Sequence, residues 1–256
     1  MKDVQLSAII LAKNAEELIG ECLQSVAFCD EIIVVDTGST DTTIAIAKKH
    51  GARVVRGVDG NFAENRNIGM REAKGEWLLY VDTDERVSPE LRKEIQSAIQ
   101  NGTDAAYRLE RKNFYLGNHP WPKIELLERL FKKSQLREWY GALHETAKVA
   151  GSIGQLHGFL LHYTHRDLAS MLEKTIAWSP IEAQLRFDAN HPKIVTWRLI
   201  RVMLTGFWNS YITQGGWKAG VMGWVESIYQ GYSMFITYAT LWEMQQKEQL
   251  EKKKIV

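Results

Sequence analysis

Short apolar runs alternate with helical patterns over the first hundred residues of the chain. Residues 6–11 and 32–35 have the length and composition of buried strands, and between them apolar residues recur at helical spacing over 18–26. The same alternation continues with a helix at 42–50, a strand at 53–55, a helix at 63–74 and a strand at 77–81. Such regular repetition predicts an α/β fold in which helices cover a mainly parallel sheet.

Local signals mark where these helices begin and end. Lys48 and Lys49 lie in the last turn of the helix expected at 42–50, and Gly51 follows in a position that favours helix termination. The run Ser88-Pro89-Glu90 combines an N-cap residue, a first-turn proline and an acid that complements the helix dipole. We therefore expect another helix to begin there.

The pattern becomes less regular beyond Asn101. Residues 105–109 and 127–132 are expected to form strands. The stretch between them is rich in Gly, His, Pro and Trp, and we expect it to be a loop that faces the substrate.

The last third of the chain is helical and rich in tryptophan. A helical pattern begins at Asp167 and breaks around 190–192. We divide the chain into a first domain, residues 1–165, and a helical extension, residues 166–256. Six of the nine tryptophans lie in this extension, at positions 178, 197, 208, 217, 224 and 242.

This tryptophan-rich segment has three interpretations: the core of a helical subdomain, an oligomer interface, or a platform on a membrane surface. The charged residues between Trp197 and Trp242 are Arg198, Arg201, Lys218 and Glu226. Trp and Tyr beside basic residues suit the headgroup region of an anionic membrane. We favour the membrane platform and keep the other two interpretations open.

Composition and charge limit the classes of function. The 256 residues are 45% hydrophobic and 25% charged, as in an ordinary folded protein, and the net charge is +1. No overall positive field is available to collect nucleic acid, so we expect no nucleic-acid partner. Cys22 and Cys29 cannot form a disulfide framework, which favours a reducing cytosolic compartment, and we interpret both as small apolar residues.

Targeting signals point to the same compartment. The first five residues lack the basic start and apolar stretch of a secretory signal, and the longest uncharged runs, 202–217 and 227–242, have sixteen residues each. A membrane-spanning helix needs about twenty mainly apolar residues. We expect a cytoplasmic protein that is at most peripheral on the inner face of the plasma membrane.

Polar residues follow three of the predicted strands. Ligands bind at the carboxyl ends of strands in an open parallel sheet, where this chain has 13–17, 36–41 and 82–85. Neither a G-x-G-x-x-G run after the first strand nor a P-loop motif occurs, which disfavours dinucleotide dehydrogenases and P-loop NTPases. Asp82 and Asp84 can bind Mg²⁺ or Mn²⁺ together with phosphate oxygens. The alternative interpretation of Asp82 and Asp84 is an acidic turn before a helix, and that of residues 36–41 is an ordinary turn and helix cap.

Four segments, in this order and spacing, resemble a known family. They are LSAIILAKN at 6–14, VVDTGSTD at 34–41, NRNIG at 65–69 and LYVDTDE at 79–85. Over residues 5–100 they look like the nucleotide-sugar domain of family 2 glycosyltransferases with the GT-A fold. YGALHE at 140–145, LHY at 161–163 and the aromatic tail resemble the branch that contains lipopolysaccharide-core β-1,4-glucosyltransferases.

The resemblance implies roles for individual residues. It makes Asp36 a contact to the uracil or another base, and Arg66 a contact to the base or the diphosphate. Asp82, Thr83 and Asp84 would line the site of the ribose and the metal-bound diphosphate. The implied donor is a UDP-sugar and the implied cofactor is Mg²⁺ or Mn²⁺.

The loop after the first strand departs from the family pattern. Many members have Asn-Glu directly after this strand, whereas here Ala15 separates Asn14 from Glu16. We therefore expect only that the loop from Ala12 to Glu16, with Asn14 in it, lines the nucleotide pocket.

Transfer also requires a base for the acceptor hydroxyl. In an inverting single displacement this base lies opposite the leaving group, on a later segment of the fold. Glu145 follows the strand expected at 127–132 and matches the family's His-Glu element, so it is our first candidate. Asp104, Glu110 and Glu125 are weaker candidates, and a surface acid is the alternative interpretation of Glu145.

Two histidines and two tryptophans have more than one interpretation. His144 would complete the metal shell of the two aspartates or touch the diphosphate, and His162 is a weaker candidate for the same role. A lone histidine is more often a structural hydrogen-bond partner. Trp121 and Trp139 either stack on a sugar ring or belong to the core.

Together with the resemblance, these observations predict a cytoplasmic, metal-dependent, inverting glycosyltransferase. Its donor is a UDP-sugar, with UDP-glucose preferred, and its acceptor is a cell-envelope glycan or glycolipid. The competing class is a noncatalytic sugar-nucleotide-binding or scaffold protein with the same fold. A sugar-nucleotide pyrophosphorylase would have a Gly-rich loop after the first strand, which residues 12–16 do not form.

Overall fold

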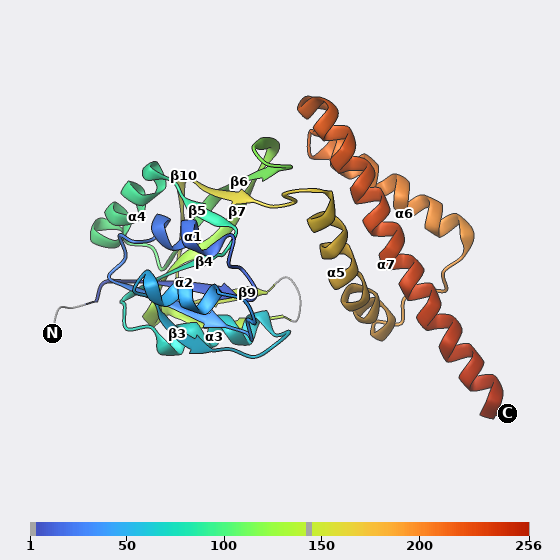
Figure 1. Cartoon of the computed structure of the whole chain (residues 1–256), viewed down its shortest axis with the longest axis horizontal. Helices are drawn as coiled ribbons and strands as arrows, with labels where there is room; N and C mark the ends of the chain where they lie inside the picture. Colours follow the sequence, from blue (N-terminus) through green and yellow to red (C-terminus); the bar gives the residue numbers. More distant parts are fainter. Residues whose placement is uncertain (1–3, 142–144, 256) are drawn as a thin grey trace. The chain divides into compact units, whose positions relative to one another are not determined.

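The chain forms two compact units. The computed structural model describes residues 4–141 and 145–255 (Figure 1). The sheet unit comprises the chain up to Lys112 together with Ile124–His162, and the helical unit comprises Asn113–Lys123 together with the chain from Tyr163 onward. The tip of one hairpin therefore belongs to the same unit as the C-terminal helices.

Four parallel strands form one half of the main sheet. They are β1 (Leu6–Ala12), β2 (Glu31–Asp36), β3 (Arg53–Arg56) and β4 (Trp77–Asp82). Their order is β3-β2-β1-β4, and β1 pairs in parallel with both β2 and β4. The central strands β1 and β4 are almost wholly buried, which is why their side chains form continuous apolar runs. The predicted α/β fold with a parallel sheet is confirmed.

Three helices connect these strands, and a fourth follows β5 (Glu85–Val87). They are α1 (Ile19–Ser25), α2 (Thr43–Lys49), α3 (Phe62–Glu72) and α4 (Pro89–Asn101). The side chain of Asn61 caps α3 by accepting the N–H of Glu64 at 3.0 Å. The Ser88 hydroxyl caps α4 by accepting the N–H of Leu91 at 3.2 Å, and Pro89 lies in the first turn. The predicted start of α4 is therefore confirmed.

Antiparallel strands extend the sheet beyond β4. They are β5 (Glu85–Val87), β6 (Ala106–Tyr115), β7 (His119–Lys132) and β10 (Ile153–Tyr163). The full order is β3-β2-β1-β4-β7-β6-β10-β5, with β7 antiparallel to β4 and β5 antiparallel to β10. After a short 3₁₀ turn at Lys133–Gln135, β8 (Leu136–Tyr140) and β9 (Thr146–Val149) form a separate two-stranded sheet.

The prediction of a loop between residues 109 and 127 is wrong. Strands β6 and β7 run on as a hairpin, and the turn is confined to 116–118, where Leu116 and Gly117 have φ angles of +43° and +88°. The Gly, His, Pro and Trp residues that suggested a loop lie in or beside a hairpin whose charged side chains pair across it, as Arg111 Nε does with Glu125 Oε2 at 2.9 Å. Such cross-strand pairs stabilise strands that lack an apolar pattern.

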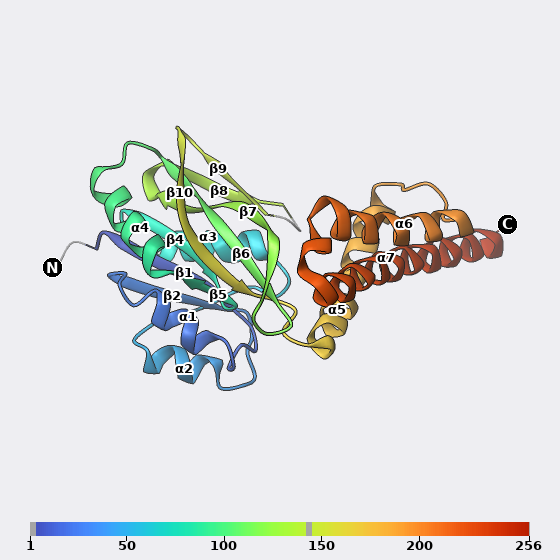
Figure 2. The ribbon, with the colours of Figure 1, turned by 90° about the horizontal axis from the view of Figure 1, so that it is seen from above.

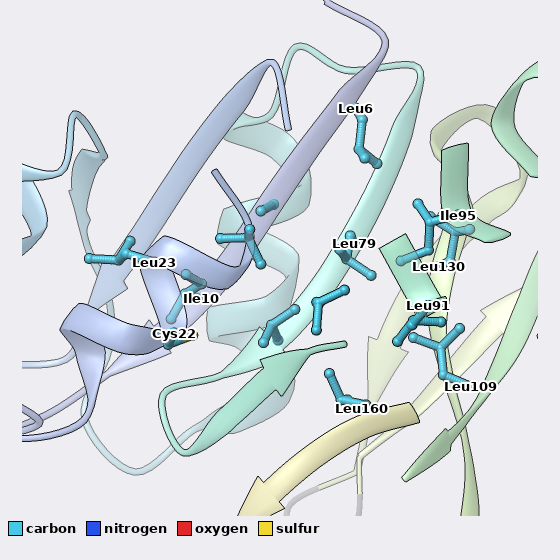
Figure 3. Packing of buried hydrophobic residues seen from close by; sticks show 14 of the residues in the cluster. Leu6, Ile10, Cys22, Leu23, Leu79, Leu91, Ile95, Leu109, Leu130 and Leu160 are labelled. Carbon is cyan, nitrogen blue, oxygen red and sulfur yellow. The ribbon is translucent and has the colours of Figure 1, made fainter. Parts of the chain in front are cut away.

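The main core of the sheet unit lies between the sheet and helices α1 and α4 (Figure 3). Ile10 and Leu79 of the central strands are fully buried, as are Leu91 of α4 and Leu160 of β10. Both cysteines are free, and burial raises the pKa of the Cys22 thiol far above its ordinary value. At neutral pH Cys22 is therefore a neutral, small apolar group of the core.

The helical unit contains α5 (Leu168–Asp188), α6 (Thr196–Trp208) and α7 (Gly220–Ile255), with a π-helical turn at Asn209–Thr213 and a 3₁₀ turn at Gly216–Ala219. Helices α5 and α6 both pack on α7 (Figure 2). A capping box between Asp167 and Ser170 begins α5, and the predicted break around 190–192 separates it from α6. Over the part of the chain that the structure describes, no helix is both long and apolar enough to cross a membrane.

Most tryptophans of the helical unit are exposed. Their exposed fractions range from 47% to 63%, for Trp197, Trp208, Trp217, Trp224 and Trp242. Smaller residues such as Val202, Ala183 and Leu241 are buried instead. The interpretation of the tryptophan-rich segment as a hydrophobic core is therefore wrong for these five residues.

Candidate active site

The carboxyl ends of β1, β2 and β4 meet at one edge of the sheet. In the parallel register, Ala12 of β1 lies beside Asp36 of β2, and Leu11 lies beside Asp82 of β4. The polar segments that follow these strands therefore start at neighbouring points. Ligands bind at such an edge in open α/β sheets.

Asp36 is buried, and the turn that follows it holds its carboxylate. Its Oδ2 accepts hydrogen bonds from the N–H groups of Gly38 at 3.1 Å and Ser39 at 3.2 Å. Gly38 has a φ of +105°, a backbone conformation that residues other than glycine rarely adopt. Asp36 thus fixes the strand-to-helix turn, and its contact to a nucleobase stays a prediction.

The loop after β1 is tied to the turn after β2. Asn14 has a φ of +47°, and its side-chain oxygen accepts the N–H of Thr40 at 2.8 Å. The Glu16 carboxylate accepts the N–H of Thr42 at 3.0 Å and its hydroxyl at 2.7 Å. The side chains of Asn14 and Glu16 therefore join the two loops at the edge of the sheet, which gives the segment from Ala12 to Glu16 a fixed shape.

Asp82 lies between two arginines. Its Oδ1 is 3.2 Å from Arg66 Nη2, and its Oδ2 is 2.7 Å from Arg129 Nη2. Burial alone would raise the pKa of Asp82, but the guanidinium groups of Arg129, Arg66 and Arg111 lower it well below its ordinary value. Fixed cations therefore already neutralise this carboxylate, and its role as a metal ligand stays a prediction.

The ion pairs continue beneath the site through residues that the sequence analysis did not assign to it. Glu85 is fully buried, and its Oε1 is 3.4 Å from Arg129 Nη2 and 3.1 Å from Arg111 Nη1. Burial would lower the pKa of Arg129, but Asp82 and Glu85 raise it. Groups of alternating charge thus form one chain: Glu125, Arg111, Glu85, Arg129, Asp82, Arg66 and Glu145. Glu128 and Arg129 interrupt the apolar residues at 126–131, and this interruption was the available signal for Arg129.

Glu145 is joined to this chain through Arg66. The Arg66 guanidinium is buried and donates from Nε to Glu145 Oε1 at 2.7 Å, while its centre lies 5.0 Å from the Trp139 ring and 5.6 Å from the Tyr80 ring. Arg66 therefore bridges Asp82 and Glu145. Among the residues that the structure describes, its buried Nη1 has no hydrogen-bond partner. Contact of Arg66 with a base or diphosphate stays a prediction.

The structure brings Asp84 to His162 rather than to a second aspartate. His162 Nε2 lies 3.1 Å from Asp84 Oδ2, because His162 of β10 pairs in register with Glu85 of β5. The Thr83 carbonyl between the two aspartates accepts a hydrogen bond from Arg86 Nη1 at 2.7 Å. Within the described residues no group of three or more His, Cys, Asp or Glu side chains could hold a metal ion. The prediction for His144 lies outside the described residues.

Other candidates for the base have partners elsewhere. Glu125 pairs with Arg111 at the far end of the chain of charges, and Glu110 Oε1 lies 2.9 Å from His157 Nδ1. Neither is linked to Asp82 as directly as Glu145, which a single guanidinium separates from it.

Trp121 and Trp139 are core residues. Trp121 of the helical unit is 2% exposed and packs against Tyr115 and Met222. Trp139 of the sheet unit is 6% exposed and makes edge contacts with Tyr80 and Phe131. Burial therefore contradicts the interpretation of Trp121 as a stacking platform for sugar, and that of Trp139 stays a prediction.

A pocket of about 400 Å³ opens beside the N-terminus of α3. It is lined by Gly60, Asn61, Ala63, Glu64, Asn67, Trp139 and Gly141. Asn67 fixes one wall, because its side chain donates to the Trp139 carbonyl at 2.9 Å and accepts the Trp139 N–H at 2.8 Å. Since Trp139 also contacts Arg66, this pocket is adjacent to the bridge between Asp82 and Glu145.

The fold is that of a GT-A glycosyltransferase. The crystal structure of S. aureus TarS 1–349 in complex with UDP-GlcNAc aligns with a TM-score of 0.51 at 16% identity, over 95% of this chain and 92% of that chain. The structure of the same protein in complex with UDP aligns with a TM-score of 0.50 at 15% identity and the same coverage. At this identity the likeness establishes the fold alone, and the predicted fold class is confirmed.

Family membership rests on the sequence. The model of glycosyl transferase family 2 matches residues 7–153, more than half of the chain, so this chain belongs to that family and is a glycosyltransferase. It is 24% identical over 253 residues to the lipopolysaccharide core biosynthesis glycosyltransferase LpsC of Rhizobium meliloti, over 93% of this chain and 92% of that protein. It is 25% identical over 262 residues to the uncharacterized glycosyltransferase RP128 of Rickettsia prowazekii, over 96% of this chain and 89% of that protein.

Proposed function

We propose that this glycosyltransferase moves glucose from UDP-glucose to a cell-envelope glycan or glycolipid, with inversion at the anomeric carbon. The observation that carries the proposal is the Arg66 bridge, in which Nη2 contacts Asp82 and Nε contacts Glu145. This bridge brings a candidate base to the acidic motif that ends β4. Donor and acceptor would therefore meet within the sheet unit.

The nucleotide would bind at the edge formed by β1, β2 and β4. We assign the wall of its pocket to the loop from Ala12 to Glu16, the base contact to Asp36, and the ribose and diphosphate region to Asp82-Thr83-Asp84. The rigid junction between the loops after β1 and β2 supports this assignment, because a preformed pocket loses little entropy when it binds a ligand. The buried Nη1 of Arg66 is a donor suited to a diphosphate oxygen.

A divalent cation fits Asp84 and His162 better than Asp82. The Asp84 carboxylate and the His162 imidazole lie 3.1 Å apart, whereas both carboxylate oxygens of Asp82 contact arginines. One carboxylate and one imidazole, with diphosphate oxygens, form a donor set for Mn²⁺, whereas Mg²⁺ takes oxygen ligands. When bound, the cation would stabilise the negative charge that develops on the departing diphosphate.

Glu145 would act as the general base. Its carboxylate accepts the proton of the acceptor hydroxyl while the hydroxyl oxygen attacks the anomeric carbon and the bond to the diphosphate breaks. One displacement at this carbon inverts its configuration. Arg66 holds the Glu145 carboxylate at 2.7 Å and thereby fixes the direction from which the acceptor is deprotonated.

The acceptor would enter the pocket beside α3. Its volume of about 400 Å³ suits one or two sugar rings, and Asn61, Glu64 and Asn67 provide polar groups in its lining. The relative LpsC is named for lipopolysaccharide core biosynthesis, which supports a cell-envelope acceptor. We further propose a cytoplasmic enzyme, peripheral on the inner face of the plasma membrane, with residues 1–165 as the catalytic domain and 166–256 as a helical extension.

A panel of nucleotide-sugars tests the donor. The purified chain is incubated with UDP-glucose, UDP-galactose, UDP-GlcNAc and GDP-mannose, with Mn²⁺ or with EDTA, and nucleotide release is measured. We expect release from UDP-glucose in Mn²⁺ and at most a few per cent of that rate in EDTA. A preference for GDP-mannose would contradict the assignment of the donor. Full activity in EDTA would contradict the assignment of the metal.

A further inference from the structure

Helix α6 of the helical unit is largely apolar on two opposite faces. One face packs on α7, where Val202 is buried and a Cβ atom added to Gly206 would lie 3.2 Å from the Cα of Gly231. Just beyond the helix, Ser210 continues this face and accepts a hydrogen bond from the Ser227 hydroxyl at 3.0 Å. The contact with α7 thus accounts for one face of α6 and leaves the other uncovered.

The uncovered face has a stripe of large apolar side chains. Trp197, Ile200, Leu204 and Trp208 follow one another at helical spacing and are 56%, 56%, 64% and 63% exposed. With Arg201 and Thr205 they line an open groove of about 470 Å³. Soluble proteins rarely leave such a contiguous apolar surface in water, so a stripe of this kind marks an interaction surface.

The charged residues in the segment that carries this stripe are all basic. Between residues 189 and 225 the charged residues are Lys193, Arg198, Arg201 and Lys218, a charge of +4. The whole chain carries +1, so the remaining residues together carry −3. Arg198 and Arg201 lie 5.2 and 5.3 Å from the Trp197 ring centre. An anionic surface would therefore attract this segment.

We propose that the exposed face of α6, from Trp197 to Trp208, is a docking surface for an anionic lipid membrane. The tryptophan rings would lie at the headgroup level, Ile200 and Leu204 would reach the acyl boundary, and the arginines would contact lipid phosphates. The proposal rests on the proposed function, because a glycolipid acceptor is reached at a membrane. A second copy of the chain is a poorer partner, since two such faces would bring arginines of like charge together.

Cosedimentation of the full chain with lipid vesicles tests the proposal. We expect binding to vesicles of phosphatidylcholine with about one-third phosphatidylglycerol, and at least tenfold weaker binding to phosphatidylcholine alone. Raising the salt from about 0.1 M to about 0.5 M should weaken binding without abolishing it, because salt screens the charges and not the apolar contacts. Replacing Arg198 and Arg201 together by Gln should lower the affinity for anionic vesicles roughly 20-fold.

Two tryptophan variants locate the surface. The double variant Trp197→Ser, Trp208→Ser should lose at least tenfold in vesicle affinity and keep its melting temperature, because both rings are exposed. The control is Trp242→Ser, which removes a tryptophan of similar exposure outside the groove, and it should bind within twofold of the unchanged chain. An equal loss in the control would overturn the assignment to this face.

Two other outcomes would also overturn the proposal. One is no binding of the unchanged chain to anionic vesicles. The other is a dimer in sedimentation analysis that the double serine variant converts to a monomer, which would identify a second copy as the occupant. Hydrolysis of UDP-glucose by the same variants is measured without lipid and should not change. If the unchanged chain binds anionic vesicles but does not hydrolyse UDP-glucose, the proposed function is contradicted and the docking surface is not.

Discussion

Replacing Arg129 by methionine tests whether the alternating charges hold the site together. Arg129 Nη2 lies 2.7 Å from Asp82 Oδ2 and 3.4 Å from Glu85 Oε1, and Glu85 is fully buried. Methionine is a long side chain without charge, so both carboxylates would keep their positions and lose the cation that they share. Removing one partner of a buried ion pair costs about 3–5 kcal/mol. We expect a loss of this size in the free energy of unfolding at pH 7.

The loss should depend on pH. Burial would raise the pKa of Asp82, but Arg129, Arg66 and Arg111 lower it below its ordinary value of 3.8. A carboxyl group with a lowered pKa in the folded state adds stability that is present above this ordinary, unfolded pKa and is lost as the pH falls through its folded pKa. The variant lacks the part of this contribution that Arg129 supplies, which is the largest of the three arginine contributions. The difference in the free energy of unfolding between the two proteins should therefore be largest at pH 7 and become smaller below about pH 4.

Urea unfolding of the full chain, followed by circular dichroism at pH 7 and at acidic pH, measures both effects. Arg108→Met is the matched control, because Arg108 pairs with Glu128 at 3.0 Å on the same hairpin but is 47% exposed, and such a pair contributes about 0–1 kcal/mol. Arg129→Lys should recover part of the loss, since lysine keeps the charge without the planar group. A loss for Arg129→Met no larger than that for Arg108→Met would refute the reasoning.

Three further predictions concern the site and the tryptophans. Asp84→Asn should weaken Mn²⁺-dependent UDP binding at least tenfold, and His162→Gln should weaken it less. Titration calorimetry measures both affinities, and a UDP affinity of the unchanged chain that EDTA does not alter would contradict the bound metal. Glu145→Gln should keep UDP affinity and lower kcat by roughly 10²–10⁴, and a kcat equal to that of the unchanged enzyme would exclude it as the base. Trp139→Ala should cost about 3–5 kcal/mol in urea unfolding, whereas Trp217→Ser should cost less than about 1 kcal/mol, and equal losses would contradict the burial that separates them.

The parallel half of the sheet could be predicted because burial on both faces leaves a direct trace in the sequence. The strands at 6–11 and 77–81 are continuous apolar runs, and β1 and β4 extend each by one residue, to Ala12 and Asp82. The hairpin of β6 and β7 could not be predicted in full, because its distal strands are stabilised by charged pairs across the hairpin, such as Arg111 with Glu125. No apolar alternation records those pairs.

The acidic motif of the site is visible in the sequence, and its partners are not. Arg129 reaches Asp82 across 47 positions of the chain because β7 lies antiparallel to β4. Likewise, His162 reaches Asp84 across 78 positions because β10 pairs with β5. Both contacts depend on the order of the strands, which local patterns do not specify. Composition also does not predict which tryptophans are buried, because burial depends on what packs against each ring.

We propose that the edge of the sheet with Asp84 and Glu145 transfers sugar from a UDP donor. A direct test is the release of UDP from UDP-glucose, measured in parallel for the unchanged enzyme and Glu145→Gln in Mn²⁺ with a glycolipid extract as acceptor. We expect steady release by the unchanged enzyme and a rate roughly 10²–10⁴ times lower for the variant. No release from UDP-glucose, or equal rates for the two proteins, would contradict the proposal.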